Sequence, residues 1–172
     1  MFILFLPAGF ANMAPVLANK IPYLNKWKTP LDFGHKYKNQ RVFGTNKTWR
    51  GLITGAIFAG IIALCIQWLF VDRYTSLGSN DWLVFIAGAW LGTGALVGDA
   101  VESFFKRQKG VPSGSSWFPF DQTDYIIGGM LFISPFIHLR LIDYATIFVM
   151  YFSLHLVVSY IGFLIGLKDK PI

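Results

Sequence analysis

The sequence is poor in charged residues and in cysteine. Of its 172 residues only 14% are Asp, Glu, Lys or Arg, whereas soluble domains carry about 25%. The hydrophobic share is 54% and the mean hydropathy is +0.50. This balance excludes an ordinary soluble domain and indicates an integral membrane protein. The one cysteine, Cys65, lies in an apolar run and has no second cysteine for a disulfide or a thiolate metal site.

Five apolar stretches predict an all-α membrane protein, a bundle of five transmembrane helices in a single domain of residues 1–172. A spanning helix needs about 20 residues. The first stretch contains Pro7, Asn12 and Pro15, which suggests a broken helix packed against protein and not against lipid. The predicted spans are residues 2–18, 52–71, 82–99, 125–141 and 145–167.

The bases are distributed unevenly between the segments that join these spans. Loop 19–51 holds eight of the 15 Lys and Arg residues, loop 98–124 holds three and the C-terminal tail holds two, which leaves Arg73 and Arg140. The positive-inside rule puts the base-rich segments in the cytoplasm. We therefore expect a multi-pass protein of the cell membrane with its N-terminus outside and its C-terminus inside. Both polar loops would then form an active site on the cytoplasmic face.

Glycines recur at four-residue spacing in the third predicted span, as Gly88 with Gly92 and as Gly94 with Gly98. Small residues at this spacing let helices approach closely in lipid. Because Gly, Ala, Leu and Trp make up most of this span, we expect it to lie at the centre of the bundle.

The third span continues without a break into a polar segment, residues 98–107. If the helix continues too, four polar side chains at i, i+3, i+4 and i+7 share one face: Asp99, Glu102, Ser103 and Lys106. A solvated ion pair between Glu102 and Lys106 is one interpretation. Asp99 favours a second, a functional site, because it has no base at its i+4 position and charges near a bilayer are costly.

Two further acids, Asp121 and Asp124, follow a linker of residues 110–120 that is rich in Gly, Pro and Ser. Such a linker can fold back and bring Asp121 to Asp99, although an ordinary flexible loop is the alternative. Hard carboxylate oxygens suit Mg²⁺, which also takes phosphate oxygens as ligands. The acids therefore predict a Mg²⁺ site next to a phosphorylated substrate.

The first polar loop ends in a segment rich in hydrogen-bond donors, residues 44–51, directly before the second predicted span. A helix N-terminus offers free N–H groups and partial positive charge to anions. Asn46 and Thr48 would add side-chain donors. Lys47 and Arg50 would add full charges. We expect phosphate binding here; the alternative is a helix N-cap with bases that only reach the lipid headgroups.

Together these motifs resemble the CDP-archaeol synthases, a family related to the bacterial CDP-diacylglycerol synthases. Residues 46–51 read NKTWRG, an element of the archaeal family, and residues 98–107 read GDAVESFFKR, which is similar to the bacterial GDxxESxxKR pattern. Residues 121–124 read DQTD and are similar to the bacterial DRxD pattern, with Gln122 in place of Arg. The size, the five spans and the order of the motifs also fit, so the resemblance covers nearly the whole chain.

The resemblance implies a Mg²⁺-dependent nucleotidyltransferase, a cytidylyltransferase that acts on CTP and an isoprenoid ether-lipid phosphate (unsaturated archaetidic acid). Its products would be CDP-archaeol and pyrophosphate, made for membrane phospholipid synthesis. The implied metal ligands are Asp99 and Asp121, with Asp124 and Glu102 next in line. The implied catalytic residues are Asp99, Asp121, Lys106 and Arg107. The implied CTP- and phosphate-binding residues are Asn46, Lys47, Thr48, Arg50, Ser103 and Glu102.

The alternative functions are a CDP-alcohol phosphotransferase and a small transporter or scaffold. A CDP-alcohol phosphotransferase also works at this membrane face, but its motif begins Asp-Gly, whereas here the order is Gly98-Asp99. A small transporter or scaffold whose acids conduct cations would carry acids within its spans, and no Asp or Glu lies deep in any predicted span. The expected partners are CTP, the lipid phosphate and membrane lipids, with no nucleic acid. The sequence does not indicate an oligomeric state.

Overall fold

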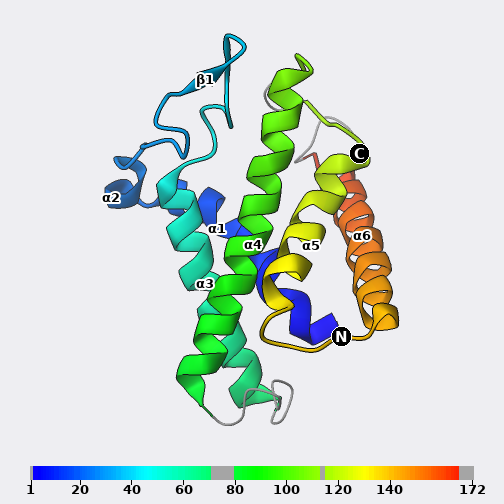
Figure 1. Cartoon of the computed structure of the whole chain (residues 1–172). Coiled ribbons are helices and arrows are strands. Elements are labelled where there is room, and N and C mark those ends of the chain that lie inside the picture. Colours follow the sequence, from blue (N-terminus) through cyan, green and yellow to red (C-terminus); the bar gives the residue numbers. More distant parts are fainter. Residues whose placement is uncertain (1, 71–79, 113–114, 167–172) are drawn as a thin grey trace.

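Each of the five apolar stretches forms a helix in the computed structural model, which describes residues 2–70, 80–112 and 115–166. These helices are α1 (Phe2–Lys20), α3 (Trp49–Leu69), α4 (Asp81–Gln108), α5 (Phe120–Ile133) and α6 (Leu141–Leu164). Between α1 and α3 the chain forms a short helix and an antiparallel hairpin, which are α2 (Pro22–Asn25), β1 (Lys36–Tyr37) and β2 (Gln40–Arg41). Apart from this hairpin, the prediction of a helical bundle is confirmed (Figure 1).

Three of the described helices are long and apolar enough to cross a membrane. They are α3, α4 and α6, whose most apolar windows have mean hydropathies of 2.2, 1.6 and 2.0. This agrees with the prediction of a membrane protein, whereas the crossing of α1 and α5 stays a prediction. The predicted span ends at Val71 and Leu167 lie outside the described residues, as do Arg73, Lys168 and Lys170 of the charge count.

Helix α4 is longer than the third predicted span. Expected to end at residue 99, it continues to Gln108, so its last turns occupy the start of the predicted loop 98–124. Lys106 and Arg107 lie in the last turn, where the partial negative charge of a helix C-terminus favours bases. The expectation that the helix runs through the polar segment is confirmed.

Helix α5 begins and ends earlier than the fourth predicted span of residues 125–141. It covers Phe120–Ile133 and stops shortly before Pro135. Proline has no N–H for a helical hydrogen bond and disfavours helical backbone in the residue before it. Because α5 already begins at Phe120, Asp121 and Asp124 lie on the first turns of a helix and not in a loop. Helices α3 and α6 likewise begin three and four residues earlier than predicted.

Helix α4 lies at the centre of the bundle and packs against α1, α3 and α5 (Figure 1). Glycines make its closest contacts. A Cβ atom at Gly92 would collide with Ala59 of α3. One at Gly98 would collide with the main-chain carbonyl of Asp124 in α5. The predicted central position of this helix, with small residues at its contacts, is confirmed.

Helix α1 is continuous although it contains Pro7 and Pro15, so the expectation of a broken helix is wrong. One of its faces carries small buried side chains, which are Ala8, Ala11, Ala14 and Ala18. This face lets α1 pack closely against α3 and α4, as a helix packed on protein would. Neighbouring helices can stabilise the main chain where proline removes a hydrogen bond, which is why the prolines do not interrupt the helix.

The first polar loop folds back so that its two ends pair. The main-chain N–H of Leu31 donates to the carbonyl of Lys47 at 2.9 Å. The N–H of Trp49 donates to the carbonyl of Thr29 at 3.0 Å. Between these ends, the hairpin of β1 and β2 lies beside the last turns of α4 (Figure 1). The loop thereby presents its last residues to the polar end of α4.

Candidate active site

A cavity of about 360 Å³ lies where the first polar loop meets the helices. Cavities that bind small ligands have volumes from about 300 Å³ upward. Its polar lining consists of Asn12, Asn46, Lys47, Thr48, Asp99, Asp121, Asp124 and His155. Its apolar lining consists of Pro15, Val16, Leu31, Gly51, Leu52 and Leu96. The two polar segments that the sequence singled out therefore meet at one cavity, as expected.

Three carboxylates gather beside this cavity, and two of them, Asp99 and Asp124, line it. One oxygen each of Asp99, Glu102 and Asp124 lies within 4.8 Å of the other two. Asp99 and Glu102 are one turn apart on α4, and the missing side chain of Gly98 lets α5 bring Asp124 against them. Like charges this close disfavour one another unless a cation compensates them. An all-oxygen donor set at this spacing fits a hard ion such as Mg²⁺.

Lys47 joins the two polar segments. Its Nζ lies 2.5 Å from Oδ2 of Asp99, a residue 52 positions further along the chain. The two side chains are only 23% and 29% exposed, and partial burial strengthens their attraction relative to a fully solvated pair. Asp99 thus has a base as its partner, but the base comes from the first loop and not from its own helix.

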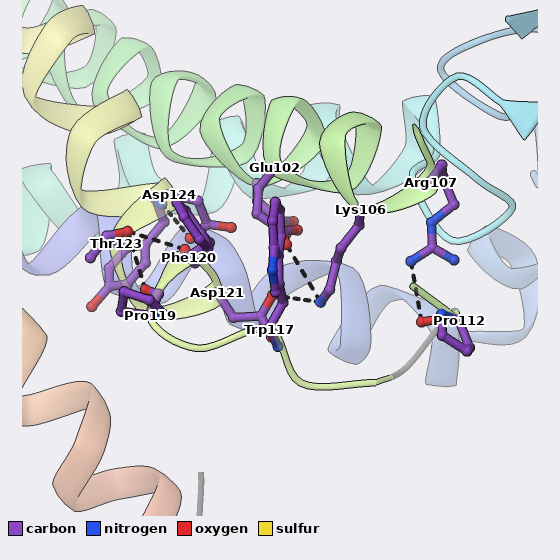
Figure 2. Close-up of polar contacts among 12 residues, drawn as sticks. Glu102, Lys106, Arg107, Pro112, Trp117, Pro119, Phe120, Asp121, Thr123 and Asp124 are labelled. Atoms are coloured by element: carbon purple, nitrogen blue, oxygen red, sulfur yellow. Dashed lines mark hydrogen bonds and ion pairs between the residues drawn. The ribbon is translucent and has the colours of Figure 1, made fainter. Parts of the chain in front are cut away.

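Lys106 lies between two acids (Figure 2). Its Nζ is 2.5 Å from Oδ1 of Asp121 and 3.5 Å from Oε1 of Glu102. The ion pair within α4 that the sequence left open is therefore present, but its side chains are buried and not solvated, and the shorter contact joins α4 to α5. The Asp121 carboxylate also accepts from the main-chain N–H of Trp117 at 2.7 Å. This second bond fixes the chain just before α5.

Asp121, expected as a metal ligand, lies beside the group of three carboxylates and not in it. It lines the cavity, but its oxygens accept from Lys106 and Trp117. Glu102, expected to bind substrate and only next in line as a metal ligand, belongs to the group. Helical spacing explains the difference. Glu102 follows Asp99 by one turn of α4, whereas Lys106, one turn further on, meets Asp121.

Thr48 and Arg50 hold the start of α3. Thr48 is the N-cap, because its Oγ1 accepts from the N–H of Gly51 at 3.2 Å. The N-cap that the sequence left as an alternative is therefore present, and Thr48 lines the cavity as well. Arg50 is buried and donates to the Leu24 carbonyl and to Oδ1 of Asn19, both at 3.2 Å. Its guanidinium thus joins α3 to α1 and α2, away from the cavity lining.

Ser103 and Arg107 lie near the site without lining the cavity. Ser103 is buried on the inward face of α4. Arg107 approaches the first loop at Gly44 and donates to the carbonyl of Pro112 at 3.3 Å (Figure 2). The guanidinium of Arg107 therefore holds the linker that follows α4.

Two polar residues of the cavity lining were not among the predicted site residues, Asn12 in α1 and His155 in α6. Oδ1 of Asn12 is buried and has no hydrogen-bond partner among the described residues. The His155 ring lies 5.8 Å from the ring of Tyr125. Both are polar side chains within apolar stretches, and that isolation is the signal in the sequence that marks such residues as functional candidates.

Known proteins are similar in sequence to this chain along most of its length. The family model described as CarS-like, CDP-archaeol synthase, matches residues 1–172. A CDP-archaeol synthase of Methanoculleus marisnigri is 37% identical over 150 residues, which cover 83% of this chain and 89% of the relative. A CDP-archaeol synthase of Thermococcus onnurineus is 35% identical over 170 residues, which cover 96% of this chain and 92% of the relative.

A solved structure described as an intramembrane enzyme for archaeal membrane lipids biosynthesis has the same fold. It is 25% identical, with a TM-score of 0.74, and the match covers 91% of this chain and 90% of that chain. Fold, motifs and full-length similarity thus agree with one another. The chain belongs to the CDP-archaeol synthase family and is, as a member of it, a cytidylyltransferase.

Proposed function

We propose that this enzyme transfers the CMP group of CTP to an unsaturated archaeal ether-lipid phosphate, giving CDP-archaeol and pyrophosphate. An oxygen of the lipid phosphate bonds to the α-phosphorus of CTP, and the bond from that phosphorus to the oxygen bridging the β-phosphate breaks. The lipid phosphate is already an anion near pH 7, so the step needs no general base. The printed names of the relatives, CDP-archaeol synthases, support this product.

The observation that supports this reaction best is a group of three carboxylates beside one cavity, with Lys47 paired to one of them, Asp99. Asp99, Glu102 and Asp124 have the donor set and spacing to hold Mg²⁺. Asp121 lines the cavity beside them. Bound there, Mg²⁺ would neutralise phosphate oxygens of the nucleotide. Lys47, from the first loop, supplies positive charge to the same cavity.

The phosphate contacts of this proposal come mainly from the first loop. Asn46, Lys47 and Thr48 line the cavity and provide an amide, an ammonium and a hydroxyl. Lys106 contributes indirectly, because its ammonium forms an ion pair with Asp121. Arg50 stabilises the loop that presents these groups. Ser103 and Arg107 lie beside the cavity and support the residues that line it.

The lipid phosphate would enter from the bilayer. Next to its polar groups the cavity has an apolar wall that includes Val16, Leu52 and Leu96. Such a wall suits a glycerol ether whose chains remain in lipid. In this proposal α1, α3, α4, α5 and α6 all cross the membrane. The N-terminus lies outside and the site faces the cytoplasm, because the base-rich loop belongs on that side.

Product analysis tests the proposed reaction. Purified enzyme given labelled CTP, Mg²⁺ and digeranylgeranylglyceryl phosphate should form labelled CDP-lipid and pyrophosphate. Omission of the lipid phosphate, or addition of EDTA, should stop both products. A CDP-alcohol phosphotransferase would instead consume CDP-lipid and release CMP, and a transporter or scaffold would form neither. Folded enzyme that makes no CDP-lipid would overturn the proposal.

A further inference from the structure

The first polar loop is organised around Asp32. Its side chain is 1% exposed although it belongs to a loop. Nη2 of Arg41 donates to the carboxylate at 2.6 Å. The main-chain N–H groups of Gly34 and Phe43 donate to it at 2.9 Å and 3.1 Å. A buried carboxylate that satisfies one base and two amides is an anchor for the residues that surround it.

The anchor is charged at neutral pH. Burial by itself would raise the pKa of the Asp32 carboxyl, but the bonds from Arg41, Gly34 and Phe43 outweigh burial, and the pKa lies below its usual value. Loss of this carboxylate would leave a guanidinium and two N–H groups without their shared acceptor. Groups left unpaired in this way destabilise a structure by more than the net value of the bonds they lose.

The anchor adjoins the main-chain pairing that presents Lys47. Leu31 directly precedes Asp32 and donates its N–H to the carbonyl of Lys47 at 2.9 Å. Beside this bond, Pro30 and Thr48 form an antiparallel bridge. From this pairing the side chain of Lys47 reaches the cavity. The position of the lysine therefore depends on residues adjacent to the anchor.

We propose that Asp32 is a positioning residue, which fixes the loop ends through its contact with Arg41 and so holds Lys47 against Asp99. Without the anchor, the pairing of Leu31 with Lys47 loses the support of the turn that follows Asp32. The Lys47 ammonium would then leave its 2.5 Å contact with Asp99 more often. The role of Lys47 toward phosphate rests on the proposed function, whereas its position does not.

The first test measures the position of Lys47 without any activity. Lys47 is only 23% exposed and is paired, so it should react slowly with a water-soluble amine-acylating reagent. In Asp32→Asn we expect Lys47 to react roughly 10-fold faster, which is within the range for residues that are coupled through a shift of the backbone. The matched control is Asp81→Asn, which removes an acid at the opposite end of α4 and should leave the rate unchanged. Unchanged Lys47 reactivity in Asp32→Asn would overturn the proposal.

The second test uses CTP kinetics and rests on the proposed function. Asp32→Asn should raise KM for CTP more than it lowers kcat, because the loss is one of substrate binding. Added to Lys47→Met, it should cause no further loss, because its effect passes through the lysine. Additive losses would show that Asp32 acts by another route and would contradict the proposal.

A milder variant covers the case in which Asp32→Asn does not fold. Arg41→Lys keeps the positive charge but loses the planar fork, so it should change Lys47 reactivity in the same direction by a smaller factor. An unchanged rate there counts against the proposal in the same way. If wild-type enzyme fails to turn over CTP, the proposed function fails, while the labelling experiment still decides the position of Lys47.

Discussion

The charged side chains of this site act in pairs and groups. Lys47 pairs with Asp99 and Lys106 pairs with Asp121, each at 2.5 Å. These contacts hold both ammonium groups at the protein and keep their flexible stems from extending to the lipid headgroups. A nucleotide and its cation would then compete for groups that are already oriented, which lowers the cost of ordering them on binding.

The grouping of acids leads to a prediction about metal affinity. Glu102 belongs to the three clustered carboxylates, whereas Asp121 is held by Lys106. Glu102→Gln should therefore raise the Mg²⁺ concentration for half-maximal activity by about 10-fold or more, since even residues that only support metal ligands change affinity by roughly 10–100-fold. Asp121→Asn should lower activity but shift this concentration much less. Mg²⁺ titrations of both variants, with Asp81→Asn as the control, would check it.

The opposite order, a larger Mg²⁺ shift for Asp121→Asn than for Glu102→Gln, would contradict this prediction. It would mean that Asp121 exchanges Lys106 for the ion when substrate binds. The titration therefore separates the ligand set that the geometry favours from the set that the family resemblance implies.

Residue types near the site could be predicted from the sequence, but their partners could not. Helical spacing alone indicated that Asp99, Glu102 and Lys106 share a face. The contact of Arg50 with the end of α1 and the burial of Asp32 depend on how distant segments pack. Asp32 does carry a local signal, since Asp two residues before a glycine favours a side-chain-to-backbone turn.

At the scale of elements, the site depends on how closely α4 and α5 approach. A Cβ atom at Gly98 would meet the main-chain carbonyl of Asp124, and a main-chain atom cannot rotate away. Gly98→Ala should therefore separate the helices beside the clustered carboxylates. We expect overpacking to lower the free energy of unfolding by about 1–3 kcal/mol. Activity should fall further than the fraction of unfolded protein explains, because the clustered carboxylates are moved apart.

The matched control is Gly9→Ala in α1. Gly9 is also helical, and nothing lies within 4 Å of the position that its Cβ would take. This change should leave activity intact and stability unchanged or higher, because alanine favours helix more than glycine does. Thermal unfolding and CTP turnover of both variants would be measured together. Equal behaviour of the two would show that the close approach at Gly98 is not needed.

The existence of the helices was predictable because each apolar stretch is long, whereas their ends were less so. Polar residues on an inward face extend a helix beyond its apolar part, as α4 shows by continuing to Gln108. The early start of α5 at Phe120 puts polar residues on a helix that packs on α4. Hydropathy reports contact with lipid, so it cannot reveal a helix turn whose polar side chains face protein.

At the scale of the whole molecule, the length of α5 limits how it can cross the bilayer. It has 14 residues, which gives a length of about 21 Å, whereas the hydrocarbon core is about 30 Å thick. The central helix α4, with 28 residues, is about 42 Å long and exceeds that thickness. If α5 crosses, the residues between Ile133 and α6 must span the rest of the core; Ile137 among them is buried, whereas Ser134, Pro135 and His138 are exposed.

Accessibility of engineered cysteines would decide this. In a Cys65→Ala background, Lys109→Cys and Arg140→Cys put single thiols at exposed positions on either side of α5. We expect a membrane-impermeant maleimide to label position 109 only in inside-out vesicles and position 140 only in right-side-out vesicles. Lys38→Cys, in the first polar loop, is the control and should behave like position 109. Labelling of positions 109 and 140 from the same side would mean that α5 does not cross. The C-terminal tail would then lie on the side opposite to both polar loops. The assignment of the base-rich segments to one side, which assumes five crossings, would be wrong.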